Sequence, residues 1–204
     1  MRKLFLSLFV LVPFVASAQN TKPFKVNVAA GYAATADYSN SDAPTKGGFV
    51  YSVEPQYRIV KNLDLGLRFE HSFVQRPEYI DKVIVFQTNA KYILSGLLTA
   101  TYSLPLKGKF IPYVGVGGGL YHTAPSTQSY RPFNITVTYP LPATNVLGGL
   151  ARVGVKWGRI NLDGAYNMVS TSSVKTSSTG LSLEGRNSYY SVKVGFTIGG
   201  GDAE

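Results

Sequence analysis

Two histidines, His71 and His122, are the residues in this chain best suited to general base chemistry. A histidine beside a serine can activate the hydroxyl as a nucleophile, and Ser72 and Ser126 are the serines nearest to them in sequence. Glu70 precedes His71, but the two residues have opposite parity on the predicted strand, so Glu70 cannot orient the imidazole as a hydrolase of this type requires, and no acidic residue stands beside His122 and Ser126. We therefore predict no catalytic residues and no enzyme, with a lipid-modifying enzyme as a less favoured alternative.

Metal and cofactor chemistry has little support in the sequence. The chain has no cysteine, so it has no thiolate chemistry, no cysteine-based zinc site and no disulfide framework. The glycine-rich run at residues 115–119 can be compared with a dinucleotide-binding loop, but Leu120 stands where the motif needs its third glycine. We predict no metal and no cofactor, and expect these glycines to relieve crowding in a barrel or to let a strand bend.

The remaining candidate functional residues are charged side chains that alternate with apolar ones along the sequence. An unpaired buried ion costs several kcal/mol, and the interior of an eight-stranded barrel is just wide enough to be filled by side chains. We therefore expect these charges to pair in a structural network inside a narrow lumen; a proton or ion pathway is the alternative. The predicted members are Glu54, Arg58, Asp64, Arg68, Glu70, Arg152, Lys156, Asp163 and Lys193.

Alternation with a period of two residues predicts the strands that position these charges. A strand between lipid and a polar lumen sends apolar side chains outward and polar ones inward. Pro55 stands within one such run and predicts a local bulge or bend. Eight runs predict an all-β fold, a closed eight-stranded antiparallel transmembrane β-barrel. They cover residues 24–34, 49–59, 63–73, 93–104, 110–122, 145–157, 160–169 and 188–198.

The links between these runs alternate short and long, as in outer-membrane barrels with short periplasmic turns and longer external loops. A soluble β-sandwich is the alternative, but it gives no reason for this alternation or for apolar side chains on the exposed face. The short links are residues 60–62, 105–109 and 158–159, and the long ones are residues 35–47, 74–92, 123–144 and 170–187.

Turn chemistry predicts the strand register at two links. Residues 158–159 fit a two-residue hairpin that begins with glycine, which pairs Trp157 with Ile160. Asp163 then lies between the two inward basic residues of the preceding strand.

At residues 60–62, a three-residue turn places Glu54 opposite Arg68 and Arg58 opposite Asp64. Both predicted pairs join opposite charges in the lumen.

Residues 1–18 are predicted to be a secretory signal peptide, which leaves residues 19–204 as the barrel domain. Arg2 and Lys3 precede an apolar run, and residues 16–18 supply an A-x-A cleavage site. A membrane-spanning helix is the alternative for that run, which has about a dozen residues where a bilayer needs about 20.

The chain is basic, with 20 Lys and Arg against 11 Asp and Glu. It has no motif typical of nucleic-acid binding, so we expect no nucleic-acid partner. Attraction to anionic lipopolysaccharide or another anionic envelope polymer is the simpler explanation of the charge, and we expect outer-membrane lipid to be a partner of the barrel. The external loops at residues 123–144 and 170–187 are long enough to offer surface for an extracellular ligand.

The strand from Pro112 to Tyr121 reads P-Y-V-G-V-G-G-G-L-Y, and a Ser-Ala-Gln junction occupies residues 17–19. In these features the chain resembles the small eight-stranded outer-membrane β-barrel family typified by outer-membrane protein X and the membrane domain of outer-membrane protein A, and most of all the porin-like barrel proteins of Bacteroidetes. The resemblance implies insertion by the barrel assembly machinery, which reads the final strand. Here that strand ends at Ile198, whereas many members end on an aromatic residue.

The sequence thus predicts a protein of the bacterial outer membrane with both termini in the periplasm, and we expect a monomer. Its expected role is non-enzymatic: the barrel anchors external loops for surface contact or envelope integrity. A narrow porin-like diffusion channel remains the main alternative.

Overall fold

The structure is a computed structural model. It describes residues 23–36, 47–74, 79–81, 84–89, 92–106, 108–130, 137–170, 172–175, 182–185 and 187–200. The predicted signal peptide lies outside these residues. Within them, no helix is long and apolar enough to cross a membrane.

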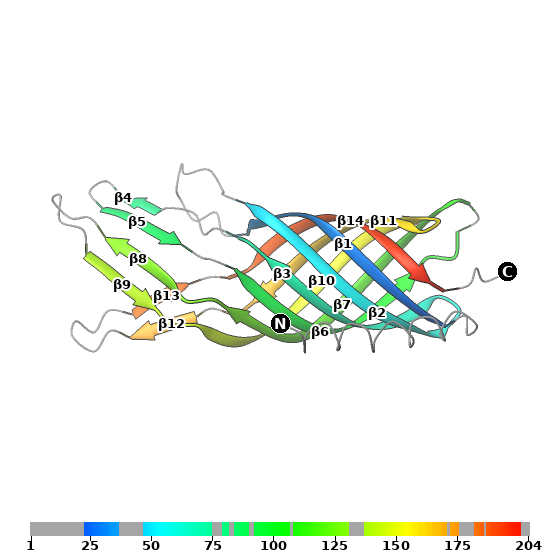
Figure 1. Ribbon diagram of the computed structural model, residues 1–204, viewed down its shortest axis with the longest axis horizontal. Helices are drawn as coiled ribbons and strands as arrows, with labels where there is room; N and C mark the ends of the chain where they lie inside the picture. Colours follow the sequence, from blue (N-terminus) through cyan, green and yellow to red (C-terminus); the bar gives the residue numbers. More distant parts are fainter. Residues whose placement is uncertain are drawn as a thin grey trace, which may run out of the picture.

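Eight strands form one closed antiparallel barrel (Figure 1), which confirms the predicted all-β fold. Their order around the barrel is β1-β14-β11-β10-β7-β6-β3-β2, so the first and last strands pair and close the sheet. Each strand begins and ends within one residue of its predicted limits. The strands are β1 (Phe24–Thr35), β2 (Gly48–Val60), β3 (Leu63–Ser72), β6 (Ile93–Ser103), β7 (Phe110–Thr123), β10 (Thr144–Trp157), β11 (Ile160–Val169) and β14 (Tyr189–Gly199).

The hairpin between β10 and β11 has the predicted register. Trp157 pairs with Ile160 across a two-residue turn, in which Gly158 has a φ of 58°. A positive φ at the first turn position suits a hairpin turn of the primed type, and glycine adopts it without steric cost.

The hairpin between β2 and β3 differs from the prediction in its turn. Arg58 pairs with Asp64 as expected, but Val60 pairs with Leu63, so the turn holds two residues and not three. A register shift between Arg58 and Val60 absorbs the extra residue. The ladder with β1 runs through Pro55 without a shift, so the bulge lies nearer the turn than the position of the proline suggested.

Three of the long links contain short strands, which the composition did not predict. One four-stranded sheet has the order β4-β5-β8-β9 and combines two links, and β12 pairs with β13 in the last link (Figure 1, left). The added strands are β4 (Tyr79–Asp81), β5 (Ile84–Asn89), β8 (Ser126–Tyr130), β9 (Val137–Leu141), β12 (Ser172–Lys175) and β13 (Ser182–Gly185).

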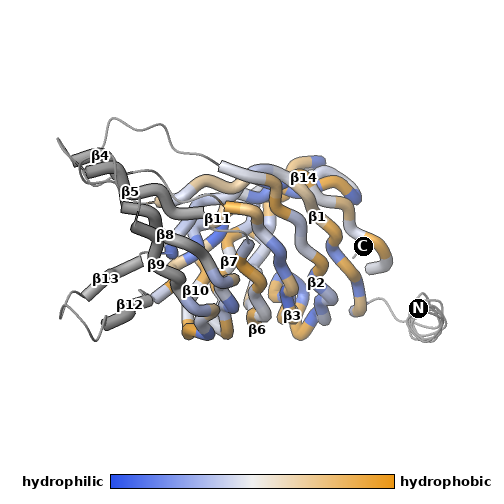
Figure 2. The backbone as a smooth tube through the Cα atoms, turned by 60° about the vertical axis from the view of Figure 1, so that its left-hand side comes forward, coloured by the Kyte–Doolittle hydropathy of each residue, from blue (hydrophilic) through white to orange (hydrophobic). Residues whose placement is uncertain are grey.

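The outer face of the barrel is apolar, with hydrophobic residues recurring along its strands (Figure 2). Leu98 and Val116 at mid-strand are 72% and 62% exposed. Aromatic side chains are exposed toward both rims, including Trp157 and Phe196 near the short turns and Tyr32 and Phe69 farther along. Such a face suits contact with lipid and not with water.

Candidate functional site

All nine predicted charged residues occupy inward positions of the barrel strands. Seven of them are buried, and Arg58 and Lys156 are half-buried. The alternation that makes the outer face apolar therefore also gathers these ions in the interior.

Arg152 on β10 holds Glu54 on β2 with two parallel ion contacts. Its Nη1 and Nη2 atoms lie 2.6 Å and 2.7 Å from the two oxygens of the Glu54 carboxylate. The hydroxyl of Thr99 also donates to Glu54 at 2.7 Å, and Arg152 donates to Thr101. Arg68, the predicted partner of Glu54, lies farther from it, at 3.8 Å.

Arg68 makes its shortest ion pair with Glu70, two residues along the same strand. Its Nη2 atom lies 2.7 Å from Glu70 Oε2. Lys193 on β14 pairs with the same carboxylate oxygen, and the hydroxyl of Tyr189 donates to the other at 2.8 Å. Glu70 thus links β3 to the strand that closes the barrel.

Asp163 lies among three cations and one hydroxyl. It is 3.5 Å from Arg68, 3.7 Å from Lys193 and 4.0 Å from Arg152, and the hydroxyl of Tyr113 donates to it at 2.9 Å. One of the two predicted basic neighbours on β10 is thus present; the other, Lys156, pairs with Asp64 nearer the short turns.

These ions form the middle layer of the lumen, in which three cations face three carboxylates. Equal numbers of opposite charges in contact are what burial demands, because an uncompensated ion in such a site is costly. The middle layer consists of Arg68, Arg152, Lys193, Glu54, Glu70 and Asp163.

A second group of ions lies nearer the short turns and is centred on Asp64. Lys25 Nζ lies 2.5 Å from this carboxylate, Arg58 Nε 3.4 Å and Lys156 Nζ 3.5 Å. Lys156 also donates to the hydroxyl of Ser103 at 2.8 Å. Lys25 was not among the predicted members of the network, although its position on β1 has the inward parity.

The buried apolar side chains near the long links form a cluster that we call the apolar plug, and polar side chains such as Ser95 and Thr123 are buried at the same end. Leu97 and Leu150 are both 1% exposed, and the Tyr121 hydroxyl donates to Asn167 at 3.0 Å. Sequence reasoning missed this layer because it expected the lumen face to be polar throughout. The plug consists of Ala33, Val50, Val74, Ile93, Leu97, Tyr121, Leu150, Ala165, Val169 and Tyr189.

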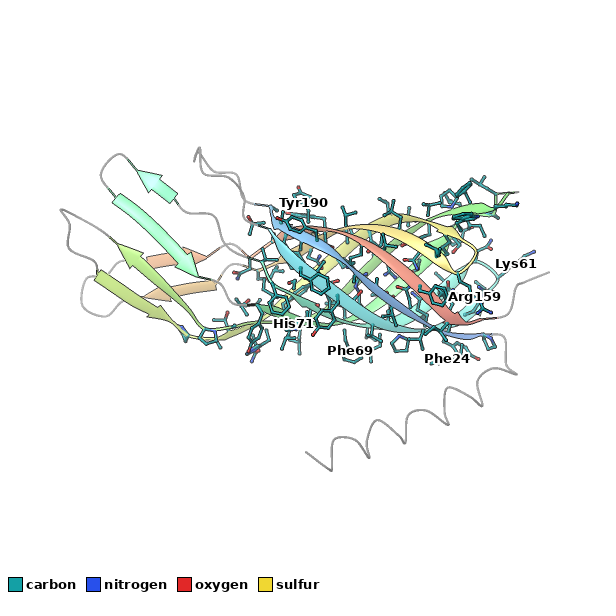
Figure 3. All side chains as sticks on the ribbon, turned by 45° about the horizontal axis from the view of Figure 1, so that its top comes forward. Phe24, Lys61, Phe69, His71, Arg159 and Tyr190 are labelled. Atoms are coloured by element: carbon teal, nitrogen blue, oxygen red, sulfur yellow. The ribbon has the colours of Figure 1, made fainter. Side chains whose placement is uncertain are left out.

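At the opposite end, the lumen opens into a cavity of about 570 Å³ that we call the turn-end vestibule. Residues from all three short links and from both ends of the barrel chain line it. Lys61 and Arg159 stand at this end of the barrel, away from His71 and Tyr190 (Figure 3). Lys61 and Arg159 also line the cavity, so its mouth is basic.

Glycines on inward positions make room for the buried ions. A Cβ atom at Gly115 would lie 2.8 Å from Arg152 Nε, and one at Gly66 would lie 2.8 Å from a Glu54 oxygen. This agrees with the prediction that the glycine-rich run relieves crowding inside the barrel. The absence of a side chain at Gly115 and Gly66 therefore leaves the space that the Arg152–Glu54 ion pair occupies.

The two histidines lie on the outer face or near the rim, apart from the ion network. His71 accepts from or donates to the Tyr51 hydroxyl at 2.8 Å, while Ser72 faces inward and donates to the Ile93 carbonyl oxygen. His122 lies 2.7 Å from Asn145 Oδ1. Among the described residues, no group of three or more histidine, aspartate or glutamate side chains is placed to hold a metal ion.

No protein-family model matches the chain, and no curated protein matches it. Among solved structures, the chain is similar to neisserial surface protein A, with 16% identity, 86% of this chain and 96% of that chain covered, and a TM-score of 0.44. It is similar to Ail, the attachment invasion locus protein of Yersinia pestis, with 10% identity, coverage of 86% and 99%, and a TM-score of 0.48. It is also similar to the N-terminal β-barrel domain of Pseudomonas aeruginosa OprF, with 16% identity, coverage of 87% and 98%, and a TM-score of 0.42.

The chain's own features decide its architecture. Its sheet closes through β1 and β14, its outer face is apolar, and its interior holds paired ions. An open soluble sheet would leave edges free and would not combine an apolar exterior with a charged interior. The chain therefore has the fold of the small eight-stranded outer-membrane β-barrels, as the resemblance in its sequence implied.

Proposed function

We propose that this protein is a non-enzymatic barrel of the bacterial outer membrane, which anchors its long links outside the cell for surface contact or envelope integrity. The observation that carries the proposal is the sealed lumen. An anchor needs a rigid, closed wall with long links at one rim, whereas a channel needs a continuous path for water.

Two layers oppose such a path. The middle layer is held by direct ion pairs between β2, β3, β10, β11 and β14, and its charges balance. Behind it, Leu97 and Leu150 of the apolar plug are each 1% exposed, and neither side chain offers a polar partner to a passing ion. The turn-end vestibule is therefore a closed recess.

The orientation that we propose puts the short turns, and with them both ends of the barrel chain, in the periplasm. Lys25 pairs with Gly199 at that rim, so the two ends lie together. Residues 1–18 would be removed on export as a signal peptide, and the barrel assembly machinery would insert the chain as a monomer. Outer-membrane lipid would contact the apolar face, and lipopolysaccharide would meet the long links.

Conductance of the purified barrel in planar lipid bilayers tests the sealed lumen. We expect no stable pores under conditions in which a porin of 16 strands, inserted in the same way, conducts. Steady single-channel currents whose ion selectivity changes in an Arg68→Ala variant would replace the anchor with the diffusion channel.

Loop replacement tests the anchoring role. Exchanging residues 170–187 for a short Gly-Ser link should leave the barrel folded, because all eight barrel strands remain. Cells that carry this variant should lose surface attachment or resistance to detergents, relative to cells that carry the intact protein. Unchanged behaviour in both assays, together with lipid A turnover that is lost in a His122→Ala variant, would instead indicate the lipid-modifying enzyme.

A further inference from the structure

The turn-end vestibule holds more positive charge than its acidic group balances. Five basic side chains and one carboxylate are among the described residues that line it. They are Lys25, Arg58, Lys61, Lys156, Arg159 and Asp64.

The single carboxylate is already shared. Lys25, at 2.5 Å, is its closest partner, while Arg58 and Lys156 lie 3.4 Å and 3.5 Å from it. Three cations around one carboxylate leave an excess of two positive charges at the floor of the cavity. Lys61 and Arg159 add two more at its rim.

This excess is local to the mouth of the barrel. The middle layer directly behind it pairs three cations with three carboxylates, so it supplies no negative charge to spare. Like charges held together repel one another, and a recess with low-dielectric walls strengthens the field that attracts an anion from water.

We propose that the turn-end vestibule binds a small, multiply charged anion of the phosphate class. Arginine and lysine side chains on the wall would donate charge-assisted hydrogen bonds to phosphate oxygens, and the amide of Asn62 and hydroxyl of Ser103 line the same space. A volume of about 570 Å³ falls in the range of small-ligand sites.

The geometry points to a water-soluble ligand and not to a lipid headgroup. The cavity is lined by Lys61 and Asn62 of the first short link, by residues 104–106 of the second and by Gly158 and Arg159 of the third. Because all three short links contribute to the lining, the cavity lies on the barrel axis, inside the ring of strands. Lipid molecules lie outside that ring and are separated from the cavity by the barrel wall. A soluble anion can instead enter from the aqueous phase along the barrel axis.

Titration of the full-length barrel with inorganic pyrophosphate tests this site. The protein is held in uncharged maltoside micelles at low ionic strength, and the heat of binding is measured. We expect one saturable site whose affinity falls as salt is added, because ions screen the attraction. Chemical shift changes should concentrate at the amides of Gly158 and Gly199, which line the vestibule.

The decisive variant is Lys61→Gln combined with Arg159→Gln. Both side chains are exposed on turns, so the barrel should keep its heat-sensitive gel migration, while pyrophosphate affinity should fall about tenfold or more. Lys109→Gln is the matched control, since Lys109 is an exposed lysine at the same rim that does not line the cavity. The pyrophosphate affinity of the Lys109→Gln variant should equal that of the unaltered protein.

Three results would overturn the proposal: no heat of binding at millimolar pyrophosphate, an equal loss of affinity in the Lys109→Gln control, or shift changes confined to other parts of the barrel. A parallel titration with short-chain phosphatidate separates the two sources of phosphate. Tighter binding of phosphatidate than of pyrophosphate would assign the vestibule to a lipid headgroup and reject the soluble ligand.

Discussion

Arg152 and Glu54 are 98 residues apart in sequence, yet their side chains meet in the barrel interior through contacts of 2.6 Å and 2.7 Å. The pair spans from β10 to β2, which are not neighbours in the sheet. It therefore crosses the lumen and ties opposite walls together, a connection that no backbone ladder can make.

Removing only one partner of this ion pair should destabilise the barrel strongly. Arg152→Ala leaves the Glu54 carboxylate buried beside too few cations, and we expect a loss of about 3 to 5 kcal/mol in the free energy of unfolding. Arg159→Ala is the matched control, because Arg159 is exposed on a turn and its loss should cost less than about 1 kcal/mol. Urea unfolding in lipid vesicles measures both. The Arg152→Ala, Glu54→Ala double variant should lose less than the two single losses added; simple additivity would show that the ions do not interact.

The apolar outer face makes a separate prediction about position in the bilayer. Leu98 lies at mid-strand and Leu106 lies on a short turn, and they are 72% and 60% exposed. Leu98→Arg should cost about 2 to 4 kcal/mol in vesicles, since a charge at the midplane is unfavourable, whereas Leu106→Arg should cost about 0 to 1 kcal/mol. Equal costs in the same unfolding assay would contradict a lipid-facing position for β6.

The glycine-rich strand offers a test of crowding within one motif. Gly115 faces inward, where a Cβ atom would meet Arg152 at 2.8 Å; Gly118 faces outward, where the nearest atom is 3.8 Å away. Gly115→Val should destabilise the barrel by about 1 to 3 kcal/mol through overpacking, and Gly118→Val should leave the unfolding midpoint nearly unchanged. If the outward variant proved the worse of the two, the inward glycines would not be serving the ion pair.

The apolar plug should behave as a packed core. Leu97→Ala removes a side chain that is 1% exposed, and we expect a loss of about 2 to 5 kcal/mol because the cavity cannot fully collapse. Leu97→Met keeps most of the volume and should cost less than about 1.5 kcal/mol. Identical unfolding curves for the two variants would show that water already fills this part of the lumen.

Local pattern predicted much of this structure, because alternation and turn type act over a few residues. The period of two found all eight barrel strands, and the glycine at position 158 set the pairing of Trp157 with Ile160. The same alternation put each of the nine charged residues on the inward face. These properties depend on the backbone near each residue, which the sequence specifies directly.

Contacts across the lumen were not readable in that way. Parity shows that Glu54 and Arg152 both face inward, but not at which height each lies after the barrel closes. Arg68 lies closer to Glu70, its same-face neighbour on β3, than to Glu54, its predicted partner on β2, because Arg152 from the opposite wall holds the Glu54 carboxylate. The apolar plug was missed because inward leucines look like outward ones in a sequence.

The pairing of β1 with β14 has a consequence for the order of folding. These strands lie at opposite ends of the chain, with Lys25 opposite Gly199, and until both are present the sheet has two unpaired edges. Lys193 on β14 also pairs with Glu70, so until the same moment that carboxylate has Arg68 of its own strand but not its second cation. A chain that stops before residue 189 would therefore form an open sheet with a hydrated inner face, and not a smaller closed barrel. We therefore expect the interior to lose its water in the same step that completes the ring of backbone hydrogen bonds. That step requires the final strand.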